Sequence, residues 1–267
     1  MAEGTCDGNF TQGPAAAEVG DIDPALEVID VNGDGHLDVV ASAAYYGLAE
    51  IGTGQEGGYL LSVMKGDGHG NLTMASVYRG GMNAYSLVVG GFRGSGAPDV
   101  LTADSSENRA TLFLNDGSGD YDGAQGEAIG YTQGVTNAPN PTIGMQVADV
   151  NGDGKPDLIV VEDGMNSTLP SEFTVMLNNG SGKFLPPVRS PITAGPSVPY
   201  PEFVTGAFRN LPTPDIVYIS RFLGGSNVVA FFPGKGDGTV ARGGYQSRRQ
   251  SRFADRYDFH LRRFCTG

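Results

Sequence analysis

The sequence lacks tryptophan and is poor in charge, with charged residues making up only 18% of its 267 positions. Such a small charged fraction is low for a helical protein. No stretch approaches the roughly 20 consecutive apolar residues of a membrane-spanning helix, so we expect no membrane insertion. The opening segment, MAEGTCDGNF, has neither the basic region nor the apolar region of a secretory signal peptide.

Cysteine and histidine are also scarce, and the common catalytic motifs are missing. The two cysteines, Cys6 and Cys265, are interpreted as unpaired thiols, with a disulfide between the two ends of the chain as the alternative. No HExxH, GxSxG or CxxC motif occurs, and no glycine-rich turn is followed by the GK[ST] of a phosphate loop. We therefore expect no enzyme activity, although a catalytic site assembled from scattered residues would leave no such motif.

Glycine and proline, in contrast, are abundant, with 42 and 16 residues. No Gly-X-Y period accompanies them, so they indicate many tight turns and not a collagen helix. Apolar residues make up 39% of the chain, which is enough to build a core. Together these features predict an all-β fold of short strands joined by Gly/Asp/Asn turns.

The charge that is present is mostly negative, with a net charge of −13 and an isoelectric point of about 4.5. An acidic surface disfavours nucleic acid and anionic membranes as partners and suits divalent cations. The exception is residues 241–267, which hold seven of the 17 basic residues, all of them arginine. This segment is either a basic arm for an anionic partner or, as we favour, a tail outside the fold.

One pattern occurs four times, at spacings of 58 to 61 residues. In each copy an apolar run leads into a nine-residue loop that ends in aspartate, and a second apolar run follows. These first to fourth loops begin at Asp30, Gly91, Asp149 and Ala207. Further along each copy, a third apolar run, an Asn/Asp/Gly turn typical of a hairpin and another strand follow.

Four antiparallel strands in a repeat of this length predict a β-propeller blade, with the apolar first strands innermost. In the third copy we expect strands at Met145–Asp149, Asp157–Glu162, Glu172–Leu177 and from Lys183 onward. The predicted divisions are 1–20 as the end of a preceding blade, blades at 21–81, 82–140, 141–196 and 197–240, and the tail 241–267. Four blades can close a propeller, and the alternative is a fragment of a larger one.

The first and third loops carry the ligand types that calcium prefers. Both have oxygen-bearing side chains at positions 1, 3, 5 and 9 and glycine at position 6, while position 7 would offer its backbone carbonyl. The predicted ligands are Asp30, Asn32, Asp34, His36 and Asp38, and Asp149, Asn151, Asp153, Lys155 and Asp157. A plain turn is the alternative, but three carboxylates and an amide on one loop favour a cation. The strand-like flanks and the nine-residue length exclude an EF-hand.

The second and fourth loops are an internal control, because they keep only the final aspartate, Asp99 or Asp215. Arg93 and Arg209 stand at position 3 of these loops. We expect each arginine to fill the vacated space and pair with the final aspartate, so that the turn persists without metal. Calcium would then reinforce only selected blades.

The motif DVNGDGxxD between two strands, with GSGAPDV in a sister repeat, resembles the FG-GAP/VCBS repeats. Those repeats form the propeller of integrin alpha subunits and of many bacterial surface proteins. The resemblance spans about residues 7–240 and is most specific at the first and third loops. It implies an extracellular or cell-surface β-propeller with calcium on one face, and it carries over no catalytic residues.

Two function classes follow from this interpretation. One is a non-catalytic, adhesion-type surface module that binds a protein or a carbohydrate, and the other is an accessory or catalytic propeller of an extracellular polysaccharide-active enzyme. Ligand contacts are expected in the loops between second and third strands, which are long in the first and third copies. Candidate contact residues are Tyr45, Tyr46, Tyr85, Tyr131 and Tyr200, each equally well explained by packing between blades.

Overall fold

The computed structural model describes residues 2–4, 10–12, 22–45, 58–79, 86–104, 109–121, 128–130, 143–162, 172–192, 202–220, 228–241 and 244–245. Within these residues the regular elements are β-strands and none is a helix, which confirms the all-β prediction. It follows that the described part of the chain contains no helix long and apolar enough to cross a membrane.

Sixteen of the strands form four antiparallel sheets, each of which runs in sequence order as a meander. The first sheet holds β3 (Ile22–Ile29), β4 (Asp38–Tyr45), β5 (Gly58–Gly66) and β6 (Leu72–Arg79). The second holds β7 (Leu87–Gly90), β8 (Asp99–Asp104), β9 (Arg109–Phe113) and β10 (Ala128–Gly130). The third holds β11 (Ile143–Ala148), β12 (Asp157–Glu162), β13 (Glu172–Met176) and β14 (Val188–Pro191).

The fourth sheet holds β15 (Glu202–Gly206), β16 (Asp215–Ser220), β17 (Val228–Phe232) and β18 (Gly244–Tyr245). A separate ribbon lies near the N-terminus, where β1 (Ala2–Gly4) pairs with β2 (Phe10–Gln12). This ribbon falls within residues 1–20, the segment predicted to end a preceding blade.

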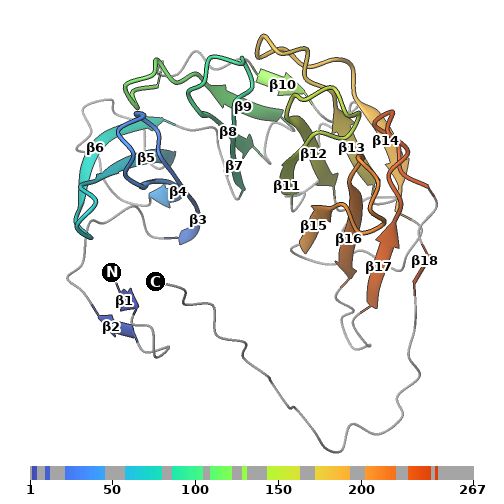
Figure 1. Cartoon of the computed structure of the whole chain (residues 1–267), viewed down its shortest axis with the longest axis horizontal. Helices are drawn as coiled ribbons and strands as arrows, with labels where there is room; N and C mark the ends of the chain where they lie inside the picture. The colour runs from blue at the N-terminus through green and yellow to red at the C-terminus, as the bar shows by residue number, and fades with distance from the viewer. Residues whose placement is uncertain are drawn as a thin grey trace, which may run out of the picture.

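The four sheets follow one another around an open arc, with the first strand of each on its inner side (Figure 1). Contacts between neighbouring sheets join these first strands, β3 to β7, β7 to β11 and β11 to β15. The innermost position predicted for the apolar first strands is therefore confirmed. The arrangement is of the β-propeller type, as the repeat period predicted, and in Figure 1 the first and fourth sheets stand apart across the opening of the arc.

Apolar side chains fill the three spaces between consecutive sheets, because alternate residues of a strand point to opposite faces and the second and third sheets pack on both. Between the third and fourth sheets the centre is Phe173, which makes edge-to-face contacts with Phe203, Tyr218 and Phe232. The other two layers include Leu61 with Phe113, and Leu112 with Leu158 and Met176.

The last strands of the third and fourth sheets begin later than the sequence suggested. In the third sheet the turn after β13 closes at the isolated pair Asn178 and Phe184, and β14 starts only at Val188, five residues after the predicted Lys183. Pro186 and Pro187 lie in between and have no N–H to donate to β13, so regular pairing stops there. Likewise β18 lies at Gly244–Tyr245, inside the segment predicted as a tail, because backbone pairing requires no side-chain pattern.

Candidate cation-binding loops

All four nine-residue loops join the first strand of a sheet to the second, so they lie at equivalent ends of the four sheets. In the first loop the carboxylate of Asp30 accepts hydrogen bonds from the backbone amides of Gly33 (2.7 Å) and Gly35 (2.9 Å). Gly33 and Gly35 have φ of +73° and +85°, a region that only glycine adopts readily, and this turns both amides inward. The loop thus wraps around the carboxylate at position 1.

The third loop repeats this geometry. The carboxylate of Asp149 accepts from Gly152 (2.7 Å) and Gly154 (2.8 Å), whose φ values are +80° and +82°. The amides of the first loop, Gly35 foremost, hold the pKa of Asp30 below its usual value. Asp30 is therefore held as a carboxylate anion.

The side chains at positions 3 and 5 face the loop as well. Asn32 Oδ1 accepts the amide of Asp34 at 3.1 Å, and Asp34 Oδ1 accepts the amide of His36 at 2.8 Å. In the third loop the same bonds join Asn151 to Asp153 at 3.0 Å and Asp153 to Lys155 at 3.0 Å. The amide of His36, followed by the Asn32 side chain, lowers the pKa of Asp34.

Position 9 has a structural role that the sequence analysis missed. The carboxylate of Asp38 is fully buried, and it accepts the amides of Val31 (2.9 Å) and Gly66 (2.8 Å). Asp157 is equally buried and accepts the amides of Val150 (3.0 Å) and Asn178 (2.8 Å). Each of these carboxylates ties its loop to the turn between the third and fourth strands of the same sheet.

In the second and fourth loops a guanidinium occupies the place beside this carboxylate, as predicted. Arg93 Nη2 lies 2.7 Å from Asp99 Oδ1, and Arg209 Nη2 lies 2.6 Å from Asp215 Oδ1. Each guanidinium also donates to the turn that follows the third strand, through the carbonyl of Asn115 or of Gly234. In these two sheets the arginine side chain, which is itself a cation, thus links the nine-residue loop to the turn after the third strand.

The two kinds of loop differ in their electrostatics. Burial raises the pKa of Asp157 despite the Asn178 and Val150 amides, and the carboxylates of Asp153 and Asp149 raise it further. Burial also acts to raise the pKa of Asp215, but the Arg209 and Gly234 hydrogen bonds and the Arg209 charge lower it on balance. The third loop therefore concentrates negative charge around a buried carboxylate, whereas the fourth supplies its own counter-charge.

The donor set of the first and third loops fits a hard cation, because every side-chain donor is a carboxylate or amide oxygen. Among the described residues, however, no three His, Cys, Asp or Glu side chains gather closely enough to hold a metal as they stand. The carboxylate oxygens face the loop's own amides, and each has a second lone pair available to a metal. The predicted ligands thus share one loop without forming a finished coordination shell.

The side chains at position 7 differ between the two loops: Lys155 pairs with the predicted ligand Asp153, whereas His36 packs on the turn after β5. Lys155 Nζ lies 3.2 Å from Asp153 Oδ2, and the ring of His36 lies against Gly68, where it leaves no room for a Cβ. Only their backbone carbonyls were predicted as ligands, and that role stays a prediction.

Several predicted residues lie outside the described part of the chain. They are Cys6, Cys265, residues 242–243 and 246–267 of the tail, the side chain of Tyr45, and Tyr46, Tyr85, Tyr131 and Tyr200. Two other tyrosines have a clear place: Tyr78 accepts the amide of Tyr121 at 2.9 Å across the boundary of the first and second sheets. Burial raises the pKa of Tyr121 strongly, so its hydroxyl stays protonated.

Comparison with known proteins gave two family matches. An FG-GAP-like repeat matches residues 91–160, and an FG-GAP repeat matches residues 24–61. No curated protein is detectably similar to the sequence.

Among solved structures, an Agrocybe aegerita lectin that recognises non-reducing terminal N-acetylglucosamine is 15% identical, with a TM-score of 0.46 over 84% of this chain and 65% of the lectin. The Photorhabdus luminescens Tc holotoxin pore, in a form with a mutation in TccC3, is 18% identical, with a TM-score of 0.44 over 92% of this chain and 10% of the toxin chain. The chain thus spans less than two thirds of either relative, and neither likeness is close enough to assign a ligand.

Proposed function

Because this chain is an FG-GAP repeat protein with a β-propeller-type fold, we propose that it is a calcium-stabilised, non-catalytic binding module that works outside the cell or on its surface. Calcium would occupy the first and third loops. The ligand would be a protein or a glycan held by loops at one end of the sheets.

The contrast between the two kinds of loop supports the calcium site. Where a loop lacks the acids at positions 1, 3 and 5, an arginine lies beside the buried aspartate at position 9. The first and third loops, which have these acids, contain no arginine, and their position 3 is Asn32 or Asn151. A cation at this place is therefore part of the fold in two sheets, and a calcium ion bound by oxygen ligands would provide it in the other two.

The expected affinity is that of extracellular calcium modules, with a dissociation constant of about 10⁻⁴–10⁻³ M. At a calcium concentration one hundred times this constant, each site would add about 2.7 kcal/mol to the free energy of unfolding. Magnesium should stabilise less, because it demands tight octahedral geometry and loses water reluctantly.

Calorimetric melting in calcium and in chelator tests the proposal. Chelator should lower the melting temperature of the wild type, and the variant Asp34→Ala with Asp153→Ala should lose most of this response. The matched control is Asp67→Ala with Asp116→Ala, which removes two exposed turn aspartates outside the loops and should keep the full response. A wild type that melts alike in calcium and chelator would show that the loops are ordinary turns.

The ligand class needs a separate screen. Protein and glycan arrays probed with the chain, with and without calcium, should show a bound class that depends on calcium. Incubation of a panel of polysaccharides with the chain should release no shorter products. If products did form, the chain would belong to the alternative class, a propeller of a polysaccharide-active enzyme.

A further inference from the structure

Position 2 of each loop is apolar, and in three loops its side chain is buried. Val31 of the first loop is 1% exposed, Phe92 of the second is 0% exposed and Val150 of the third is 9% exposed. The matching residue of the fourth loop, Phe208, is 56% exposed. The last loop therefore presents a residue that elsewhere in the same chain is covered.

What covers position 2 in the earlier loops is the next sheet. Val31 lies so close to the turn after β9 that a Cβ added at Gly119 would meet its side chain at 2.8 Å. The carbonyl of Val31 accepts the side-chain amide of Asn115, and the carbonyl of Phe92 accepts that of Asn178, at 2.8 and 2.9 Å. Each loop is thus seated on the hairpin of the following sheet.

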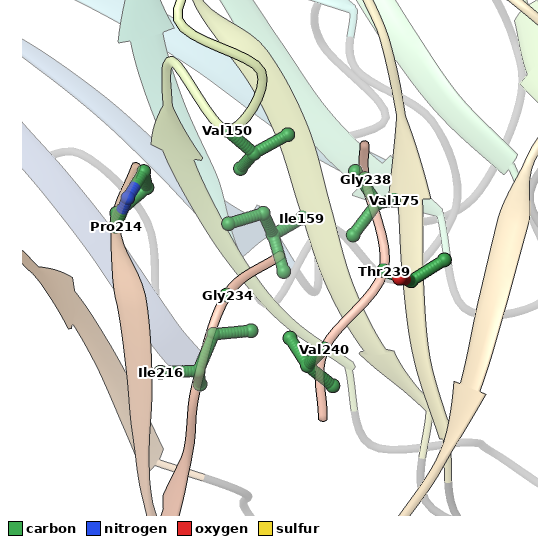
Figure 2. A pocket seen from close by; sticks show the side chains of 9 residues that line it. All are labelled: Val150, Ile159, Val175, Pro214, Ile216, Gly234, Gly238, Thr239 and Val240. Atoms are coloured by element: carbon green, nitrogen blue, oxygen red, sulfur yellow. The ribbon is translucent and has the colours of Figure 1, made fainter. Parts of the chain in front are cut away.

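The packing of a loop on the following sheet is clearest at the third loop. Val150, Ile159 and Val175 of the third sheet face the fourth-sheet residues Ile216, Gly238 and Val240 across a small apolar gap (Figure 2). The free volume is about 10 Å³, room for one water molecule at most, so this is an interface and not a ligand pocket.

The opposite end of the array has the complementary face uncovered. Leu87, Met145 and Phe203 hold the same place in the first strands of the second, third and fourth sheets, and each is at most 6% exposed against the preceding sheet. The matching residue of the first sheet, Leu26, is 62% exposed, and Val28 beside it is 51% exposed. The first sheet thus exposes, around Leu26 and Val28, the face that each other sheet packs against the preceding sheet. We call this surface the receiving face.

The fourth sheet exposes the opposite face, which in the other sheets packs against the following sheet. We call this surface, formed by Val204, Phe208 and Val229, the inserting face. Val204 and Val229 are 53% and 56% exposed, while their counterparts in the second sheet, Val88 and Ala110, are 5% and 0% exposed against the third sheet. Phe208 packs edge-to-face on Phe231 of the same sheet, with ring centroids 6.2 Å apart. Apolar patches of this kind mark docking surfaces on soluble proteins.

We propose that the fourth sheet binds the first sheet of a second copy of this chain, head to tail. The three internal boundaries show which surface covers an inserting face, namely the receiving face of a sheet of the same repeat. The chain's own receiving face stands across the open arc from the fourth sheet (Figure 1), so a second copy brings the two faces together. Such a heterologous contact can propagate to further copies.

The contact should not require calcium. The fourth loop, which would enter the partner, is held by the pair of Arg209 and Asp215, and no acid stands at its positions 1, 3 or 5. Self-association in chelator therefore distinguishes this proposal from the calcium proposal.

Sedimentation equilibrium over a range of protein concentrations, in chelator, tests the proposal. The average mass should rise with concentration from 27.8 kDa towards multiples of that value. Phe208→Asp and Leu26→Asp, which each spoil one of the two faces, should both remain monomeric, with association at least tenfold weaker. The control Leu185→Asp adds the same charge at a residue that is 50% exposed on neither face, and it should associate as the wild type does.

Mixing the two variants is the decisive arm. Leu26→Asp keeps an intact inserting face and Phe208→Asp keeps an intact receiving face, so an equimolar mixture should form a one-to-one dimer that does not extend. Circular dichroism should show both variants folded, because each substitution is at a largely exposed site. A wild type that stays monomeric at all concentrations, variants that still associate, or a mixture that stays monomeric would each overturn the proposal.

Discussion

The ninth residue of every loop is an aspartate whose carboxylate is completely buried, and the four are Asp38, Asp99, Asp157 and Asp215. Each accepts a backbone amide from the end of the third strand of its own sheet or from just after it, at 2.8 to 3.0 Å. Their persistence in the loops without other acids is the sequence signal from which this role could have been inferred. The partner amide lies 16 to 28 residues away, so the bond itself could not be predicted from a local pattern.

Replacing Arg209 should show how much stability is lost when a buried position 9 carboxylate has no cation beside it. Arg209→Met would leave the buried Asp215 without its guanidinium, and we expect the free energy of unfolding to fall by about 1–3 kcal/mol. Urea denaturation measures the change. Lys155→Met is the control, because its pair with Asp153 is solvent-exposed and should be worth less than about 1 kcal/mol. Equal effects of the two substitutions would contradict the structural role of Arg209.

Asp67 gives a prediction for acid stability. The side-chain amide of Asn71, followed by the amides of His69 and Asn71, lowers the pKa of Asp67 to about 2. A carboxyl whose pKa is lower in the folded state than its unfolded value of about 3.9 stabilises the protein above that value and ceases to do so as pH falls towards 2. The stability gap between wild type and Asp67→Ala should therefore shrink from about pH 5 to about pH 2 in urea titrations. A gap that stays constant over this range would show that the turn does not depend on the ionised carboxylate.

At the scale of the element, the first three loops share one backbone conformation. Gly94 and Gly96 of the second loop have φ of +65° and +85°, close to the values at the matching glycines of the first and third loops. The fourth loop shares only the positive φ at position 4, where Asn210 has φ +54°, because the proline at its position 6 fixes φ at a negative value. The second loop is therefore the better recipient for a transplanted ligand set.

Gly91→Asp with Arg93→Asn and Ser95→Asp should create a third calcium site. The change gives the second loop the oxygen donors of the first and removes the competing guanidinium. Titration calorimetry should find the calcium stoichiometry rising from two to three per chain. Arg93→Asn alone, which vacates the space without adding acids, should leave it at two. A triple variant that still binds only two calcium ions would contradict the role of the acids at positions 1, 3 and 5.

The elements also show where the repeat pattern predicts structure and where it does not. The spacing of the loops predicted four sheets and their innermost strands, because strand alternation and Asp-Gly turns are local signals. The last strands of the third and fourth sheets were misplaced, since Pro186 and Pro187 delay pairing and β18 has no side-chain pattern. The exposure of Phe208 could not be predicted, because it depends on what stands next to the fourth sheet.

For the whole molecule, the C-terminal segment gives a prediction with an internal comparison. Removing residues 246–267 should leave the melting temperature unchanged, because this Arg-rich stretch continues no repeat. Removing 241–267 also deletes β18, whose Gly244 and Tyr245 pair with Phe231 and Ala230 of β17, and should lower it. Calorimetry of both truncations makes the comparison. A large drop with the shorter deletion would show that the segment belongs to the fold.

The seating of each loop on the following sheet also gives the array a mechanical character. The four sheets act as plates that meet at three joints, the boundaries between consecutive sheets. Each joint is held together by the loop that crosses it. The middle joint is fastened by the loop that holds Arg93, whose charge is permanent, so it keeps its grip at any calcium level. The two outer joints are fastened by the loops proposed to take calcium. Under tension in calcium-poor surroundings, the array would therefore yield first at its outer joints, and the central pair of plates would separate last.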